Sequence, residues 1–430
     1  MKLNQADIDS ANNRHFRILK DRVKRRQQSG RDLAWLLETP HSLPYRPDYL
    51  PLRSAGKNRF QQRLNRVISA SSRSLWFRLF WPKIRQGLVS YTEHSYLPKV
   101  FQQLQMASER GELTQTITRG LREVMGYFWT ELPDCTFSEL SNCLLAIIHE
   151  PFRQLECRED VFAGEKRRQN KTCLSLLHEI DSRLKSHPRR LQILLQLCCR
   201  SNWIDSLEDD SERFLETFHL EIEDMLADGE QSRLLFRDNP FFQFKWLENR
   251  VHGTPLTILY ELDNCGEVVF DLKLVEYLVS EGHRCVLCVK SCPMVNDVTA
   301  EDLDELLKQP LLSGLNRART DERLSVITSG PFIGGGKLVH DISLEYQKTY
   351  PQVDLLIVKG QGNFQSMPMG VRQHGRFYPY PYRKPVVFMT GIKSDMVMMC
   401  LKVLFPFGKE PRRQSPFLFC FDPEDPSTYP

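Results

Sequence analysis

Two features are missing from this 430-residue sequence, and each absence excludes a class of protein. There is no run of about 18 apolar residues, so no membrane-spanning helix is predicted. Residues 1–16, MKLNQADIDSANNRHF, contain no apolar core of the kind found in secretory signals. The 12 cysteines are scattered along a large chain, so we expect mostly reduced thiols and a cytoplasmic protein.

Acidic residues are scarce in the first hundred positions. Residues 1–100 contain 20 Lys and Arg against 7 Asp and Glu, a net charge of +13, whereas the rest of the chain has 38 against 47, a net charge of −9. The densest basic block is 17–31, RILKDRVKRRQQSGR. It is interpreted as the solvated face of a helix, or alternatively as a site for an anionic partner. No nucleic-acid-binding motif accompanies it, which disfavours nucleic acid as that partner.

Complete nucleotide and zinc motifs are also absent. The segment GPFIGGGKL, 330–338, lacks the first glycine of a P-loop, because Pro331 stands there, and Leu338 replaces its Ser or Thr. No G-x-G-x-x-G follows the first predicted strand, which disfavours a dinucleotide site. Cys285 and Cys288 form a C-x-x-C pair within a predicted strand, where they point to opposite faces. No second pair follows, so zinc is disfavoured.

The rhythm of apolar residues divides the chain into three parts. Residues 1–100 are predicted to be a basic, partly helical arm. Residues 101–250 repeat apolar positions every three to four residues, which predicts a helical domain. From 251 to 430, short apolar runs alternate with amphipathic helices. We predict strands at 256–262, 284–290, 323–329, 353–359 and 384–390, and helices at 267–281, 300–308, 337–349 and 394–404. This alternation predicts an α/β fold, a three-layer α/β/α core with a mostly parallel sheet behind a helical N-terminal domain.

Polar residues and glycines gather where the predicted strands end, which is where parallel sheets bind their ligands. The five loops contain Asp263 and Asn264; Asn296 and Asp297; 329–337; 359–364; and 390–395. Taken singly, an Asp or Asn before a helix is a good N-cap, and a glycine after a strand makes a turn. Taken together, carboxylates, amides and lysines at one sheet edge favour a functional site.

This set of residues suits phosphate ester chemistry with a hard cation. Asp263, Asn264 and Asp297 are oxygen ligands of the kind that Mg²⁺ or Mn²⁺ prefers. Lys359 and Lys393 would neutralise phosphate oxygens. Backbone N–H groups of the glycine-rich loops and helix starts would add donors to the same anion.

Three ordered segments resemble the signatures of the DUF89 family, the damage-control phosphatases. DNCGEVVFDLKLVEYL, 263–278, resembles its DNAGE…FD signature, PMVNDVTAED, 293–302, its NDVT segment, and KGQGNFQS, 359–366, its KGxGN signature. The resemblance covers about 255–405, with 100–250 matching the family's helical portion more loosely. Of the RTxK motif of eukaryotic members only Lys393 remains, because Thr390 and Gly391 occupy the first two positions.

The resemblance implies a metal-dependent phosphatase of small phosphorylated metabolites, including sugar phosphates and phosphopantetheine or its damaged forms. It implies a divalent cation (Mg, Mn, Co or Ni) on Asp263, Asn264 and Asp297, with Lys359 among the catalytic residues. Glu267 would lie beside the same pocket. The substrate-binding residues predicted at the strand ends are Glu267, Ser329, Gly360, Gly362, Asn363 and Lys393.

The mechanism expected from the sequence is attack by water on a phosphorus held by the cation and Lys359. An aspartyl-phosphate on Asp263 stays open, although Cys265 stands where haloacid-dehalogenase-type phosphatases have a second Asp that acts as acid and base. Two other functions also stay open. One is a protein carboxyl methyltransferase, for which no separate adenosylmethionine loop is evident. The other is a non-enzymatic scaffold that docks partners through residues 1–100.

Overall fold

The computed structural model describes most of the chain from residue 110 onward and parts of what precedes it. The described residues are 5–28, 86, 89–90, 92–103, 110–131, 137–154, 160–204, 211–227, 244–330, 342–366, 370–373, 376–379, 384–393, 416–422 and 424–428. The glycine loop beyond Gly330, the predicted helix at 394–404 and most of the basic arm lie outside these residues.

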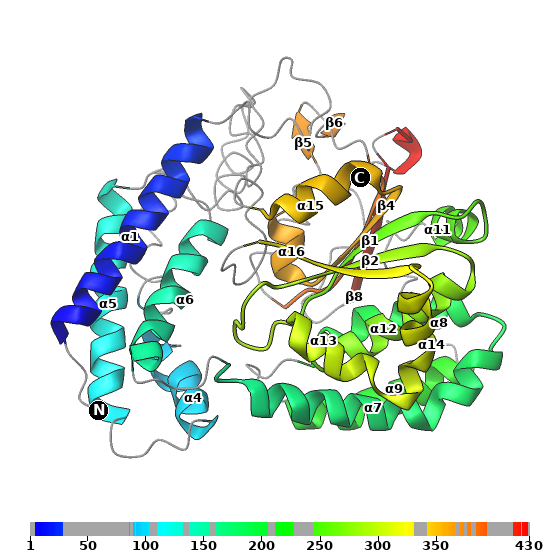
Figure 1. Cartoon of the computed structure of the whole chain (residues 1–430), viewed down its shortest axis with the longest axis horizontal. Helices are drawn as coiled ribbons and strands as arrows, with labels where there is room; N and C mark the ends of the chain where they lie inside the picture. Colours follow the sequence, from blue (N-terminus) through cyan, green and yellow to red (C-terminus); the bar gives the residue numbers. More distant parts are fainter. Residues whose placement is uncertain are drawn as a thin grey trace.

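A six-stranded sheet in the order β3-β2-β1-β4-β7-β8 forms the centre of the molecule (Figure 1). Its strands are β1 (Thr257–Glu261), β2 (Arg284–Val289), β3 (Leu324–Thr328), β4 (Leu355–Lys359), β7 (Val386–Gly391) and β8 (Pro416–Phe421). The first five pair in parallel, which confirms all five predicted strands. The unpredicted β8 runs antiparallel to β7, and a separate hairpin pairs β5 (Gly370–Gln373) with β6 (Arg376–Pro379).

Helices cover both faces of this sheet (Figure 1). On one face lie α8 (Arg190–Ser201), α12 (Val268–Ser280) and α14 (Ser313–Thr320), with α7 (Ala163–Ser186) and α9 (Ser211–Leu226) outside them. On the other face lie α15 (Leu344–Thr349) and α16 (Gln361–Ser366). The remaining helices of this part are α11 (Phe244–Val251), α13 (Ala300–Leu307) and the short turns η2 (Pro310–Leu312), η4 (Tyr350–Gln352) and η5 (Pro426–Thr428). The three-layer α/β/α prediction is therefore confirmed.

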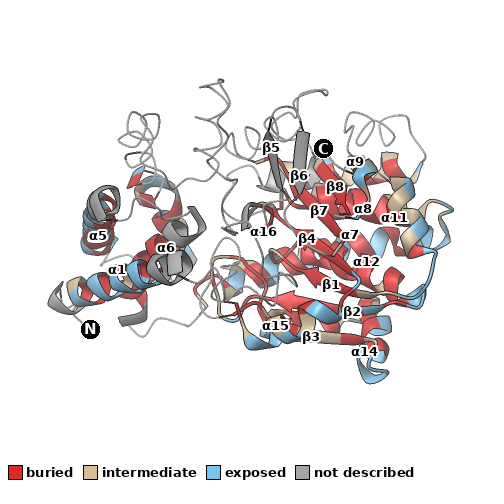
Figure 2. Cartoon of the chain, turned by 90° about the horizontal axis from the view of Figure 1, so that it is seen from above, coloured by how far each residue is buried: buried red, intermediate tan, exposed pale blue. Residues whose placement is uncertain are grey.

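The N-terminal helices pack on one another beside this core. They are α1 (Gln5–Gln28), η1 (Thr92–Tyr96), α4 (Leu97–Gln103), α5 (Arg110–Glu131) and α6 (Phe137–Gln154). Their inward faces form a hydrophobic cluster that includes Leu19, Val100, Ile117 and Phe152. In Figure 2 these helices are buried on the sides that face one another and exposed on the outside.

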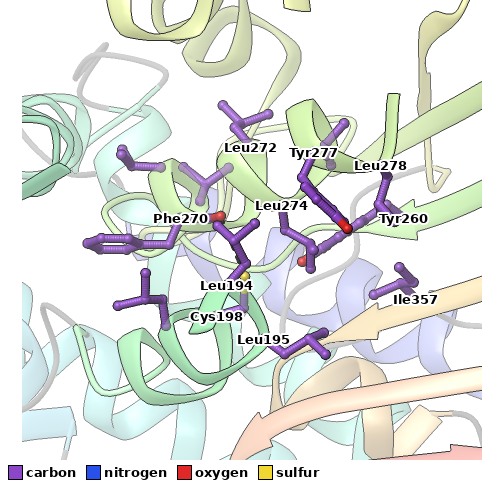
Figure 3. Close-up of a cluster of buried hydrophobic side chains, with 14 of the residues drawn as sticks. Leu194, Leu195, Cys198, Tyr260, Phe270, Leu272, Leu274, Tyr277, Leu278 and Ile357 are labelled. Carbon is purple, nitrogen blue, oxygen red and sulfur yellow. Dashed lines mark hydrogen bonds between the residues drawn. The ribbon is translucent and has the colours of Figure 1, made fainter. Parts of the chain in front are cut away.

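The main hydrophobic cluster joins α7, α8 and α12 to the sheet. Figure 3 shows its centre, where side chains of α8 and α12 meet Tyr260 of β1 and Ile357 of β4. Strand β1 is apolar on both faces because helices cover both sides of the sheet. Polar groups inside this cluster have partners, as burial requires: Tyr260 donates to Asp271 Oδ1 at 2.8 Å.

Two further observations bear on the sequence predictions. Within the described helices, none is long and apolar enough to cross a membrane. The cysteines of the described segments form no disulfides, and all but Cys292 are buried.

Candidate active site

The candidate site lies where the order of the strands reverses. β1 pairs with β2 on one side and with β4 on the other, and the chain reaches β4 only after passing through β2 and β3. Neighbouring loops diverge at such a point and leave a crevice beyond the carboxyl ends of the strands. Asp263 and Asn264 follow β1 there, and Gly360 follows β4.

Backbone hydrogen bonds join the loop after β1 to the loop after β2. Cys265 N–H donates to the carbonyl of Asn296 at 2.8 Å, and Val298 N–H donates to the carbonyl of Asp263 at 2.9 Å. A β-bridge between Asn264 and Asp297 lies between these two bonds. The structure therefore brings together three residues that the sequence predicts as cation ligands, although they lie on separate loops.

Negative charge accumulates around Asp263. Burial, Glu267 and Asp297 raise the pKa of its carboxyl group to about 8, and Lys290 and Lys393 oppose that rise. Asn264 Nδ2 donates to Asp263 Oδ2 at 3.0 Å and to Glu267 Oε1 at 2.8 Å. Asp263 itself is half-buried.

The backbone of Gly360 packs directly against the carboxylate of Asp263. Its φ is +83°, a value that glycine adopts without strain. A Cβ atom at this position would lie 1.8 Å from Asp263 Oδ2, well inside contact distance. The glycine of the predicted KGxGN segment is therefore required here by the approach of a carboxylate to the backbone.

Lys359 lies beneath this surface, which refines its predicted role. Its side chain is fully buried and donates to Glu267 Oε2, and to Asp271 Oδ2 at 3.0 Å. Burial alone would lower its pKa, but the carboxylates of Asp271 and Glu267 raise it above its ordinary value. The ammonium is thus held as the counterion of two carboxylates and does not face an open phosphate site.

Two asparagines from the helical region contact the site, which sequence reasoning missed. Asn202, at the end of α8, donates from Nδ2 to both oxygens of Glu267 at 2.9 Å. Its Oδ1 accepts from Gly391 N–H at 2.8 Å and from Thr390 Oγ1 at 3.2 Å. Asn170 of α7 accepts the N–H of Gly266 at 2.6 Å. The sequence shows only an Asn just after a helix for the first and no distinctive signal for the second.

The structure also locates the other residues that the sequence predicts for the site. Asn363 of α16 is buried, and its Oδ1 accepts from Lys290 Nζ at 3.3 Å. Ser329, at the end of β3, lines a small pocket together with Lys290 and Asn363. Gly362 lies in α16, and Lys393 is close enough to lower the pKa of Asp263. Lys290 itself was not predicted.

The donor set of this site fits a hard divalent cation. It would consist of two carboxylates, Asp263 and Asp297, and the amide oxygen of Asn264. In the described part of the chain no three His, Cys, Asp or Glu side chains group as a metal site. Burial first, and then the charges of Glu267 and Asp297, raise the pKa of Asp263, and a bound cation would offset those negative charges.

Comparisons with known proteins bear on this arrangement. The model of the damage-control phosphatase ARMT1-like domain matches residues 92–403, well over half of the chain. The chain belongs to the damage-control phosphatase family. The family match contains the loops after β1, β2 and β4 and also Asn170 and Asn202.

Two individual proteins are also similar to this chain in sequence. A damage-control phosphatase of Pyrococcus horikoshii is 31% identical over 183 residues, which are 42% of this chain and 55% of that protein. An uncharacterized protein of Methanocaldococcus jannaschii is 36% identical over 110 residues, 26% of this chain and 32% of that one. These alignments therefore span about a third to about half of the relatives' lengths.

A solved structure shows the same fold. The crystal structure of a DUF89 family protein from Pyrococcus horikoshii superposes with a TM-score of 0.52 at 20% identity. The superposition covers 76% of this chain and 96% of that one. It extends the likeness from the sequence signatures to the arrangement of most of the chain.

Proposed function

We propose that this protein is a phosphatase that hydrolyses phosphate esters of small metabolites with a divalent cation. The observation that carries the proposal is the convergence of Asp263, Asn264 and Asp297 at the reversal of the strand order. The family match supports phosphatase chemistry in general. Sugar phosphates and phosphopantetheine-like compounds are the substrates to try first.

Asp263, Asn264 and Asp297 would hold the cation, and Mg²⁺, Mn²⁺, Co²⁺ and Ni²⁺ are the four candidates. When bound, such a cation supplies positive charge against the phosphoryl oxygens and favours ionisation of water. The protein's own contribution is orientation. Asn264 donates to both Asp263 and Glu267, so the acceptor oxygens are held in fixed positions before substrate arrives.

The layer beneath these residues keeps them rigid. Lys359 neutralises part of the charge of Glu267 and Asp271, and Asn202 donates to both oxygens of Glu267. Without these partners the carboxylates would be buried uncompensated, which costs several kcal/mol. We therefore assign Lys359 a positioning role.

The surroundings of residue 265 favour direct attack by water over an aspartyl-phosphate. Phosphatases of the haloacid-dehalogenase type, which use the covalent route, have an acid two positions after the attacking Asp. Cys265 occupies that position, is fully buried, and donates its N–H to the neighbouring loop. Its thiol pKa is raised well above its usual value, first by burial and then by Asp302, so it provides no acid or base for this step.

The test is phosphate release from a panel of phosphorylated metabolites, with and without each of the four metals. We expect metal-dependent release that Asp263→Asn reduces by about 10²-fold or more, because a ligand charge is lost at the reacting centre. Asp354→Asn is the matched control, since Asp354 accepts from Thr257 N–H at the opposite end of β1. Full activity of Asp263→Asn with metal present would refute the assignment.

A further inference from the structure

Four lysines are buried in the described residues, and three of them share one arrangement. Each of the three is fully buried and forms ion pairs with two carboxylates. The groups are Lys166 with Asp160 and Asp302, Lys273 with Asp181 and Glu276, and Lys359 with Glu267 and Asp271. This is how a protein normally accommodates a buried ammonium, because an isolated charge is costly to remove from water.

Lys290 is the exception. It follows β2, and only 4% of its surface is exposed. It forms no ion pair with any carboxylate in the described segments, and its Nζ donates only to Asn363 Oδ1, at a long 3.3 Å. An ammonium has three N–H donors, so most of its hydrogen-bonding capacity is unused. Within the described residues, Lys290 is thus a buried ammonium with no carboxylate at ion-pair distance.

Asn363 explains why this lysine stays in place. The Nδ2 of Asn363 donates to the carbonyls of Leu262 at 3.2 Å and Lys359 at 2.9 Å, which fixes the orientation of the amide. Its Oδ1 is thereby turned toward Lys290. In this arrangement Asn363 orients the lysine and does not itself donate to a phosphate.

A second hydrogen-bond donor, the hydroxyl of Ser329, lines the same pocket as Lys290. Lys290 and Ser329 line one small pocket, with room for about one water molecule. The Oγ of Ser329 is buried and has no hydrogen-bond partner among the residues that the structure describes. The pocket also includes Glu261, whose carboxylate accepts the hydroxyl proton of Tyr346. An oxygen atom that accepts hydrogen bonds would satisfy both Lys290 and Ser329.

This pocket adjoins the reacting centre. It lies at the carboxyl ends of β1, β2 and β3, the same edge of the sheet that holds Asp263. The positive charge of Lys290 acts on Asp263, since Lys290 is one of the two lysines that lower the pKa of the Asp263 carboxyl group. A phosphoryl group held beside Asp263 would therefore come within the influence of Lys290.

We propose that Lys290, assisted by Ser329, binds a non-bridging oxygen of the substrate's phosphoryl group. The proposal rests on the phosphatase function proposed above and moves the phosphate-binding role from Lys359 to Lys290. It also explains the missing carboxylate: the anion that completes this site arrives with the substrate.

The test compares Lys290→Met with Lys308→Met in the full chain. Lys308 is an exposed lysine at the end of α13 and serves as the matched control. Inorganic phosphate is the probe, titrated calorimetrically with the activating metal present. We expect Lys290→Met to weaken phosphate binding about tenfold or more, because it removes a charge-assisted hydrogen bond, and Lys308→Met to leave it unchanged.

Stability provides the second readout. We expect Lys290→Met to unfold at the same denaturant concentration as the wild type or a higher one, because no carboxylate loses its partner. Lys359→Met leaves two buried carboxylates without their cation and should therefore unfold at a clearly lower denaturant concentration. Ser329→Ala is the second variant and should weaken phosphate binding without loss of stability.

Each outcome has a distinct meaning. Unchanged phosphate affinity in Lys290→Met and Ser329→Ala, with an active wild type, would overturn this inference and leave the phosphatase proposal standing. Strong destabilisation of Lys290→Met would also overturn it, since the lysine would then have a structural partner. A wild-type protein that releases no phosphate with any metal, yet binds inorganic phosphate through Lys290, would refute the phosphatase proposal alone.

Discussion

At the scale of single residues, Gly360 is the position where the smallest change should have the largest effect on activity. A Cβ at this position would meet Asp263 Oδ2 at 1.8 Å, so Gly360→Ala must displace that carboxylate. We expect the variant to fold but to lose about 10²-fold or more in kcat/KM, because a misplacement of about 1 Å at a reacting centre costs that much. Steady-state kinetics with the best substrate measures the loss.

Gly282 provides the control for backbone strain. Its φ is +96°, similar to that of Gly360, but a Cβ there would meet no atom within 4 Å. Gly282→Ala should therefore lose stability of about 1 kcal/mol from the left-handed conformation and keep its activity. Equal activity losses in the two variants would show that strain, and not the contact with Asp263, decides the outcome.

A site residue could be predicted from the sequence only where its position just after a strand fixes its place in the fold. Asp263, Asn264 and Asp297 follow strands of a parallel sheet, so their place at one edge followed from the strand pattern. Asn202 and Lys290 were not predictable in this way. The significance of Asn202 depends on contacts with residues more than sixty positions away, and that of Lys290 on which partners it lacks.

At the scale of elements, Asn202 connects the end of α8 to the start of α12 and to the end of β7. Its side chain joins Glu267, just before α12, to the backbone of Gly391 at the end of β7. Asn202→Ala leaves a buried N–H and a buried carboxylate without this partner. We expect a loss of about 2–3 kcal/mol in the free energy of unfolding and a lower kcat/KM. Urea denaturation and kinetics on the same sample measure both.

Thr390→Val is the milder comparison at this junction. It removes the hydroxyl that donates to Asn202 Oδ1 and to the carbonyl of Gly391, each at 3.2 Å, and preserves the side-chain shape. The expected loss is about 1 kcal/mol, with activity largely retained. If Thr390→Val proved as damaging as Asn202→Ala, the link between α8 and β7 would have to act through the hydroxyl.

The elements themselves were largely readable from the sequence. The five parallel strands are apolar runs flanked by turns, and the helices over 143–229 follow a 3.6-residue period. Strand β8 was missed because one short apolar run near residue 420, with no helix predicted after it, gives no alternation with helices. Helix α14, with the polar sequence SGLNRART, was missed because packing against α12 stabilises it more than its own pattern indicates.

At the scale of the whole molecule, the N-terminal helices should respond to acid before the sheet does. Burial lowers the pKa of His149 to about 4, and its Nε2 lies 2.6 Å from the hydroxyl of Tyr96. The neutral ring therefore contributes stability that is fully present above the ordinary pKa of 6.5 and is lost as the pH falls toward 4. The ring is partly exposed, so we expect a loss of roughly 1–2 kcal/mol by pH 5.

Hydrogen exchange at pH 7 and pH 5 tests this expectation. Amides of α5 and α6 should lose protection at pH 5 relative to those of β1 and β4. His149→Gln keeps a side chain that can hydrogen-bond to Tyr96 but does not titrate, so it should remove the difference between the two pH values. A wild type whose helices keep full protection at pH 5 would contradict the argument.

Strand β8 has a practical consequence for anyone who works with this family by cutting out its conserved portion. The family match ends at residue 403, whereas β8 spans Pro416–Phe421 and covers the outer edge of β7. A gene fragment trimmed to the match would leave β7, six buried residues long, with an open row of backbone donors and acceptors. Such an edge recruits other chains, so the fragment should form inclusion bodies even if every catalytic residue is present.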